Sequence, residues 1–209
     1  MNMPASMNRS GFVALADAAP EILQDIRYYT TYNFMGCRVE GYEAPCALLT
    51  REAAEALTLA AKLAIKRELR LKIFDAYRPQ RAVDHFVRWV EDSNDMIMKP
   101  WFYPEVEKSS LYELDFIGAR SSHSRGSAVD LTLLDMRTGR DLDMGGPFDF
   151  FGARSNFSWD GLTCEQSQNR WLLRNLMTHC GFLPLESEWW HFRLKDEPYP
   201  NTFFDFPVR

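Results

Sequence analysis

The sequence has few of the features that mark membrane or nucleic-acid-binding proteins. None of its 209 residues belong to a run approaching the roughly 20 apolar residues that a membrane helix needs. Acidic residues outnumber basic ones, 29 against 24, and the formal net charge of −5 gives no broad positive field for phosphate backbones or anionic lipid. Nucleic acid is therefore not an expected partner, and no membrane span is expected.

The N-terminal region also lacks the pattern of a secretion signal. The apolar stretch 11–19 is short, is interrupted by Asp17 and follows a single arginine, Arg9. The chain as written is therefore expected to be cytoplasmic, whereas a mature form that had lost a signal would be periplasmic.

Cysteine is scarce and its spacing is uninformative for metal binding. The four cysteines lie at positions 37, 46, 164 and 180, without the CxxC pairs of thiolate zinc sites or thioredoxin motifs. Cys164 and Cys180 are expected at opposite ends of one helix, roughly 24 Å apart, which is too far for a disulfide. Cys37 and Cys46 flank a candidate hairpin, where they could form a disulfide or remain two free thiols.

The composition predicts one globular domain over residues 1–209. It is 46% hydrophobic and 25% charged, and the chain has no repeat, low-complexity segment or linker. We expect residues 1–19 to be an N-terminal extension. We also expect residues 91–120, an irregular aromatic stretch with two prolines, to form a long surface excursion near the functional site.

Helical and strand patterns alternate irregularly along the rest of the chain. Thr50 is expected to cap a helix that reaches about Glu68, and Pro79 to begin another helix. A further helix is expected over 165–180, and strands are expected over 69–77, 128–134 and 188–193. This mixture predicts an α+β fold.

The stretch SSHSRGSAVD, residues 121–130, places a histidine and an aspartate seven positions apart. Gly126 permits a tight reversal between His123 and the strand that carries Asp130, so imidazole and carboxylate could converge. Taken alone, a loop histidine and an aspartate paired with an arginine explain the pattern equally well. A third ligand would decide between the two interpretations.

The stretch ESEWWHF, residues 186–192, supplies that ligand. His191 lies in an aromatic strand that would exclude bulk water. His123, Asp130 and His191 form a nitrogen and oxygen set that suits zinc and leaves a fourth position for water, as catalytic sites do. Glu188 would be the general base, taking a proton from water and delivering it to the departing amine. By itself, Glu188 would more often be an exposed loop acid before a buried strand.

Together these stretches resemble a known family. The pattern S-x-H-x-x-G-x-A-x-D at 121–130, followed by EWWH at 188–191, is similar to that of the VanX-type D-alanyl-D-alanine dipeptidases and their zinc DD-peptidase relatives. DAYRP at 75–79 is also typical of the group, and the resemblance spans roughly residues 20 to 195. It implies a small central antiparallel sheet flanked by helices, one zinc ion per chain, and hydrolysis of the D-Ala-D-Ala dipeptide without a covalent intermediate.

The resemblance also implies a role for each matching residue. It assigns the metal to His123, Asp130 and His191, general base catalysis to Glu188, and transition-state stabilisation to Arg78. An arginine beside a helix N-terminus is indeed disfavoured unless an anion faces it, although that anion could be Asp75. The substrate-binding residues it implies are Asp149 and Tyr28 for the ammonium group, Ser121 for the carboxylate, and Phe86 for the cavity wall.

Other interpretations stay open at this point. A zinc DD-carboxypeptidase or endopeptidase acting on longer peptidoglycan peptides would share these residues. A non-catalytic zinc-stabilised binding module, as in the hedgehog signalling domain, could use the same scaffold, although Glu188 and Arg78 argue against it, and a metal-free structural protein is the third alternative. His85 and His179 are expected to be structural. The sequence indicates neither an oligomeric state nor a biological role among antibiotic resistance, cell-wall recycling and nutrition.

Overall fold

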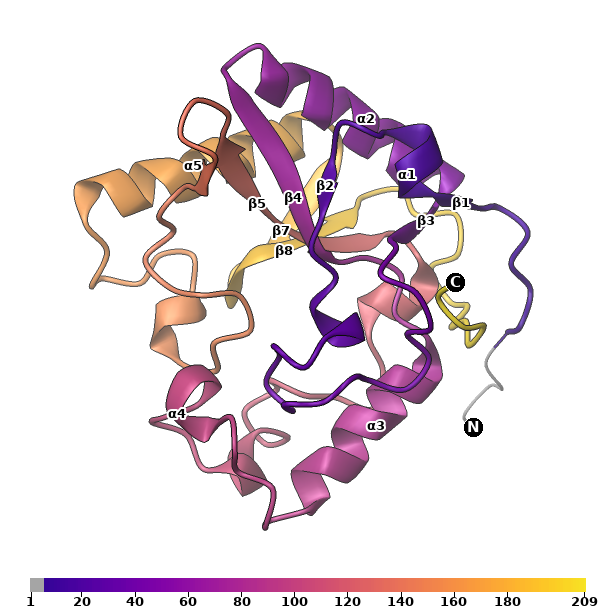
Figure 1. Cartoon of the computed structure of the whole chain (residues 1–209), viewed down its shortest axis with the longest axis vertical. Coiled ribbons are helices and arrows are strands. Elements are labelled where there is room, and N and C mark those ends of the chain that lie inside the picture. The colour runs from indigo at the N-terminus through magenta and orange to yellow at the C-terminus, as the bar shows by residue number, and fades with distance from the viewer. Residues whose placement is uncertain (1–5) are drawn as a thin grey trace.

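The structure, a computed structural model, describes residues 6–209 and is built around a six-stranded sheet. The strands follow the order β2-β4-β5-β8-β7, and β6 pairs with the C-terminal end of β5 (Figure 1). Neighbouring strands are antiparallel except for the parallel pair β2 and β4. The strand bounds are β2 Leu23–Gln24, β4 Leu69–Asp75, β5 Ala128–Asp135, β6 Arg140–Asp141, β7 Phe182–Leu185 and β8 Glu188–Leu194.

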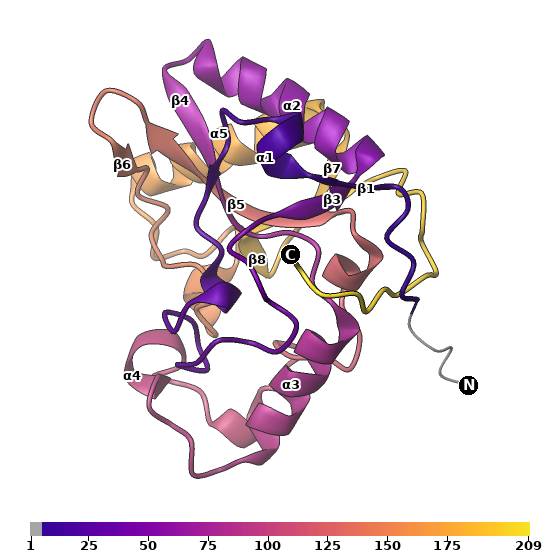
Figure 2. The same ribbon diagram turned by 45° about the vertical axis from the view of Figure 1, so that its right-hand side comes forward.

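Helices flank this sheet, as the sequence predicted for an α+β fold. The two long helices α2 and α5 lie together on one side of the sheet, whereas α3 and α4 form a separate lower part of the molecule (Figures 1 and 2). A small two-stranded sheet pairs β1 (Phe12–Ala14) with β3 (Leu48–Thr50). The helices are α1 Leu15–Ala18, α2 Arg51–Ile65, α3 Gln80–Glu91, α4 Lys99–Phe102 and α5 Cys164–His179, with short 3-10 turns η1 Arg27–Tyr29, η2 Lys108–Ser110, η3 Ser122–Arg125 and η4 Ala153–Ser155.

The ends of the long helices follow from local sequence. The hydroxyl of Thr50 accepts a hydrogen bond from the backbone N–H of Ala53 and so caps the start of α2. This helix ends at Ile65, three residues before the predicted end. Thr163 caps α5 in a reciprocal arrangement with Gln166, which satisfies two backbone donors that the first turn leaves unpaired. These caps fix where both covering helices begin.

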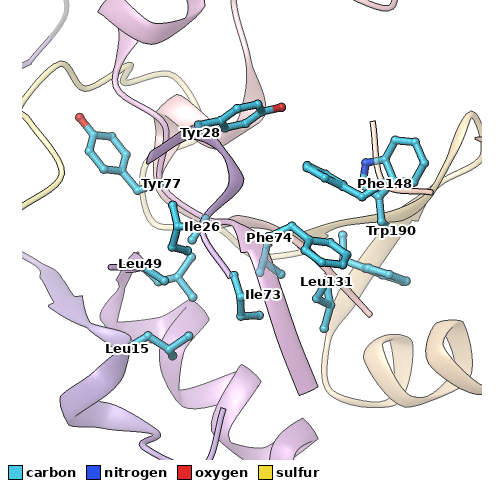
Figure 3. Packing of buried hydrophobic residues seen from close by; sticks show 14 of the residues in the cluster. Leu15, Ile26, Tyr28, Leu49, Ile73, Phe74, Tyr77, Leu131, Phe148 and Trp190 are labelled. Carbon is cyan, nitrogen blue, oxygen red and sulfur yellow. The ribbon is translucent and has the colours of Figure 1, made fainter. Parts of the chain in front are cut away.

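The core lies on both sides of the central sheet because side chains alternate along each strand. Ile73 lies with Leu15 and Leu49 on the side covered by α1 and α2 (Figure 3). The next residue on β4, Phe74, turns toward the other side and stacks on Phe148 with ring centroids 4.8 Å apart. Trp190 meets the Phe148 ring edge-on at 5.5 Å. An aromatic layer therefore covers the face of the sheet opposite α1 and α2.

Strand register brings three polar residues together at one end of the sheet. Asp130 on β5 lies directly opposite His191 on β8 and, across its other edge, opposite Asp75 on β4. Gly126 ends η3 in a left-handed conformation, with φ of 82°, and a Cβ at this position would lie 2.2 Å from the Phe12 ring. Only glycine fits this reversal, which returns the chain from His123 into β5.

Two regions differ from their expected simple form. Within residues 1–19, expected to be an extension, β1 and α1 pack on the core and Leu15 is fully buried. Within residues 91–120, the expected surface excursion, α4 and η2 form and side chains including Tyr103 and Leu111 are fully buried. The four cysteines are free thiols. Among the described residues, no helix has both the length and the apolar character needed to cross a membrane.

Candidate active site

One cavity of about 310 Å³ collects all the residues that the sequence singled out. It opens at the end of the central sheet where β4, β5 and β8 meet, and η3 and residues 115–118 of the long excursion contribute to its wall. Its volume is at the lower end of the range for ligand pockets, which suits a small substrate. The lining includes Tyr28, Arg78, Phe86, Ser121, His123, Asp130, Asp149, Glu188 and His191.

Two imidazoles and one carboxylate converge at the floor of this cavity. The candidate ligand atoms of His123, Asp130 and His191 lie within 4.8 Å of one another, and all three residues are buried. His123 Nε2 lies 3.1 Å from His191 Nδ1 and 3.2 Å from Asp130 Oδ2, while His191 Nδ1 lies 3.0 Å from Asp130 Oδ1. The structure therefore brings these three residues together, as the sequence predicted.

The remaining ring nitrogens have their own partners, which orient each imidazole. His123 Nδ1 lies 2.7 Å from the carbonyl oxygen of Ala76, directly after β4. His191 Nε2 lies 3.2 Å from the Ser122 hydroxyl. His123 is thus oriented with Nε2, and His191 with Nδ1, toward the shared point. Outer contacts of this kind are typical of histidines that bind a metal.

The surroundings shift the pKa values of two carboxyl groups, Asp130 and Glu188, in opposite directions. Burial would raise the pKa of Asp130, but His123 and His191 outweigh burial and keep that pKa well below its usual range. Burial raises the pKa of Glu188, and His191 offsets only part of the rise. Asp130 therefore favours its charged form, whereas Glu188 holds a proton more readily than an ordinary glutamate does.

Glu188 begins β8 and lies at the edge of the cluster. Its Oε2 is 3.8 Å from His191 Nδ1, and its side chain keeps 25% of its surface exposed. Partial exposure leaves the carboxylate accessible from the cavity. Glu188 thus combines a raised pKa with a position beside the candidate metal ligands.

Arg78 pairs with Asp75, the partner that the sequence offered as an alternative to a substrate anion, and it also lines the cavity. Its Nε donates to Asp75 Oδ2 at 2.9 Å, and its terminal nitrogen lies 3.6 Å from Asp130 Oδ2. The guanidinium carbon lies 4.9 Å from the ring centroid of Tyr28 and 5.1 Å from that of Phe86. The two rings and Asp75 fix the orientation of Arg78 in the cavity wall.

Asp149 is a buried carboxylate without a cation. It is 6% exposed and accepts a hydrogen bond of 2.9 Å from the Tyr28 hydroxyl. Among residues 6–209, no cationic side chain lies within ion-pair distance of Asp149. Burial and the charge of Asp130 raise the pKa of Asp149 well above its usual value. Burial without a cation therefore favours the neutral form of this carboxyl, and a positive group placed beside it would favour the charged form.

The sequence interpretation missed the contacts that support these residues. Ser122 orients His191, and Tyr42 donates to Asp75 at 2.6 Å, but neither position stood out in the sequence. Asp75 was named only as a possible neutralising partner of Arg78, although DAYRP was already visible. Ser121, the expected carboxylate contact, lines the cavity and also accepts the backbone N–H of His123 at 3.3 Å, capping η3.

The donor set fits a metal ion of the zinc type. Two nitrogens and one carboxylate oxygen, each already oriented by a neighbour, match the three protein ligands of catalytic zinc sites. A glutamate beside such a set, within an enclosed pocket, is the arrangement of a metal-dependent hydrolase. The fold and the arrangement of these residues are compatible with an enzyme of this class.

Comparison with known proteins gives the family. Residues 8–209 match the peptidase M15 family described as D-Ala-D-Ala dipeptidase. The chain is 41% identical over 199 residues to a D-alanyl-D-alanine dipeptidase of Enterococcus faecium, covering 95% of this chain and 98% of the relative. It is 38% identical over 197 residues to one of Streptomyces coelicolor, covering 94% and 98%. The chain belongs to the peptidase M15 family of D-Ala-D-Ala dipeptidases, which are metallopeptidases.

A more distant likeness exists among solved structures. A vancomycin-resistance D,D-pentapeptidase, VanY, solved in complex with Zn(II), gives a TM-score of 0.42 at 14% identity, covering 75% of this chain and 78% of that one.

Proposed function

We propose that this chain is a zinc-dependent dipeptidase that hydrolyses D-Ala-D-Ala. The observation that carries the proposal is that one small cavity joins the cluster of His123, Asp130 and His191 to the unpaired carboxylate of Asp149. A free dipeptide has an ammonium group that can pair with Asp149, whereas in a peptide extended at its N-terminus the same nitrogen is part of an uncharged amide. Membership of a dipeptidase family supports the same substrate.

His123, Asp130 and His191 would hold the zinc ion, and their neighbours would keep the ligand atoms in place. When bound, zinc supplies Lewis-acid chemistry, which polarises a carbonyl oxygen and lowers the pKa of water. The deprotonated Asp130 and the oriented imidazoles suit this role, because metal ligands must present a free electron pair.

Glu188 would move the proton. Its raised pKa and exposed edge suit a group that takes a proton from the attacking water and then delivers it to the departing amine nitrogen. The peptide bond breaks as the amine leaves, and no bond forms between substrate and protein. Trp190 and the aromatic wall limit the entry of further water.

The remaining residues would fix the two ends and the reacting centre of the substrate. Asp149, with Tyr28, binds the ammonium group, Ser121 contributes to carboxylate binding and Phe86 shapes the wall. Arg78 faces the cavity beside Asp130, where its charge can stabilise negative charge that develops on the carbonyl oxygen. A pocket that contacts both ends of the substrate would select peptides of dipeptide length.

Zinc content tests the ligand assignment. The purified protein is expected to bind one zinc ion per chain, and His123→Ala or His191→Ala should lose most of it, because each change removes one of three protein ligands. Elemental analysis after dialysis measures the content. His85→Ala and His179→Ala are the controls, since both residues lie outside the cavity, and they should retain zinc. Wild-type zinc affinity in both ligand variants would refute the assignment.

Arg78→Ala is expected to lower kcat by about a hundredfold with a smaller change in KM, because removal of one donor to a developing oxyanion typically costs that much. Steady-state kinetics on D-Ala-D-Ala provides the measurement. Arg81→Ala serves as the control: Arg81 lies three residues further along the chain, pairs with Asp205 on the C-terminal segment and does not line the cavity. A near-normal kcat for Arg78→Ala would remove this residue from the mechanism.

A further inference from the structure

Arg170 is a buried arginine whose partners are all backbone carbonyls. It lies on α5, and only 1% of its surface is exposed. Among residues 6–209, no carboxylate lies within ion-pair distance of its guanidinium group. Burial lowers the pKa of Arg170 to about 10, so the group stays charged at neutral pH and keeps its full set of donors.

The carbonyls that Arg170 binds lie on both sides of Asp149. Its Nε donates to Met144 at 2.6 Å, five positions before Asp149, and one terminal nitrogen donates to Arg154 at 2.8 Å, five positions after it. The other terminal nitrogen donates to the carbonyl oxygen of Asn156 at 2.5 Å and to that of Phe157 at 3.5 Å. One planar side chain thus connects the beginning and the end of segment 144–157 to a rigid helix.

The segment between these contacts has an unusual backbone. Asp149 has φ of 61°, in the left-handed region that residues with a side chain seldom adopt. Such a conformation persists only where the surrounding structure determines it from several sides. Besides Arg170, the backbone N–H of Phe151 donates to Phe102 at 2.7 Å, and the Ser155 hydroxyl donates to the Phe150 carbonyl.

Arg170 does not itself reach the substrate cavity. It does not line the pocket that contains Asp149, and its guanidinium carbon lies 5.8 Å from the ring centroid of Trp189. Any effect of Arg170 on the substrate must therefore pass through the segment that it binds. Asp149 is the charged residue of that segment that lines the pocket.

We propose that Arg170 is a positioning residue for substrate recognition: by binding carbonyls on both sides of Asp149, it keeps that carboxylate aimed at the ammonium group of the dipeptide. The inference rests on the proposed ammonium-binding role of Asp149. Lysine at this position would supply a compact group of donors rather than a planar fork, so it would not connect both ends of the segment.

A double-mutant cycle on the metal-loaded full-length protein tests the proposal. Arg170→Met is expected to lower kcat/KM for D-Ala-D-Ala at least about tenfold, because small displacements of a binding group are costly. In an Asp149→Asn background the same change should lower kcat/KM less than about twofold, since the group that Arg170 positions has already lost its charge. Equal losses in both backgrounds would show a general structural role and overturn the proposal.

Hydrogen exchange followed by mass spectrometry gives a second readout that does not depend on turnover. Arg170→Met should speed amide exchange within residues 144–157 while β5 and β8 keep wild-type protection. Faster exchange spread evenly over the chain would contradict the proposal. Arg88→Met is the control for the same chemical change, because Arg88 lies on α3 and pairs with Glu40 at the surface, outside residues 144–157. It should leave both kcat/KM and exchange in the segment unchanged.

Two further outcomes separate this proposal from the function on which it rests. If Asp149→Asn alone keeps wild-type kcat/KM, the ammonium role of Asp149 fails, while exchange in residues 144–157 still reports whether Arg170 fixes the segment. If Arg170→Met does not fold, Arg170→Lys replaces it in both measurements with the same expected pattern. If neither Arg170→Met nor Arg170→Lys folds, Arg170 is required for global stability and the positioning role is overturned.

Discussion

Glu188→Gln is expected to lower kcat for D-Ala-D-Ala at least about a hundredfold while zinc content and fold stay unchanged. Glutamine has nearly the same shape as glutamate, but it can neither take a proton from water nor deliver one to the departing amine. General acid and base catalysis of this kind typically supplies a factor of 10² to 10⁴. Steady-state kinetics, elemental analysis and thermal unfolding of the same preparation measure the three quantities together.

Glu186→Gln is the matched control for this experiment. Glu186 lies two residues before Glu188, pairs with Arg174 at the surface and does not line the cavity. The same chemical change at position 186 should therefore leave kcat within about twofold of wild type, as surface substitutions usually do. If Glu188→Gln behaves like Glu186→Gln, the proton carrier must be sought elsewhere.

The cluster of His123, Asp130 and His191 could be predicted from the sequence because its residues lie in two short, dense patterns. His123 and Asp130 are separated by one glycine-containing reversal, and His191 lies three residues after Glu188. Such spacing narrows the geometry, since a reversal into a strand leaves few directions for the side chains. The convergence of the two patterns then required only that β5 and β8 be neighbours, which the strand register provides.

The supporting contacts could not be predicted in the same way. Arg170 looks like any polar residue of an amphipathic helix, and its partners are backbone carbonyls, which have no sequence signature. Ser122 and Tyr42 act through single hydroxyl contacts to residues 69 and 33 positions away. The parallel pairing of β2 with β4 was also missed, because a strand of two residues carries no periodic pattern. Long-range contacts of this kind follow from the packed fold rather than from local sequence.

The pocket also makes a prediction about selectivity, for which blocking the substrate amine is expected to have the largest effect. N-acetyl-D-Ala-D-Ala should be hydrolysed at least about 10⁴-fold less efficiently than D-Ala-D-Ala, because acetylation removes the ammonium group that is proposed to pair with Asp149. A buried carboxylate without a partner, together with a steric clash in a cavity of about 310 Å³, is the kind of mismatch that costs such factors. Coupled assays of released D-alanine measure kcat/KM for both substrates.

L-Ala-L-Ala is the matched control for charge, since it keeps both the ammonium and the carboxylate groups and changes only the configuration. With both ends fixed, the inverted methyl groups would displace the scissile carbonyl, and a misplacement of about 1 Å can cost on the order of a hundredfold. The expected order is therefore D-Ala-D-Ala first and L-Ala-L-Ala second, with the acetylated peptide last. Comparable rates on the acetylated peptide would contradict the dipeptidase proposal and favour a carboxypeptidase that acts on longer peptides. Turnover of none of the three, with zinc bound, would instead favour a binding module, because the ligands would then be present without the chemistry that Glu188 and Arg78 are proposed to supply.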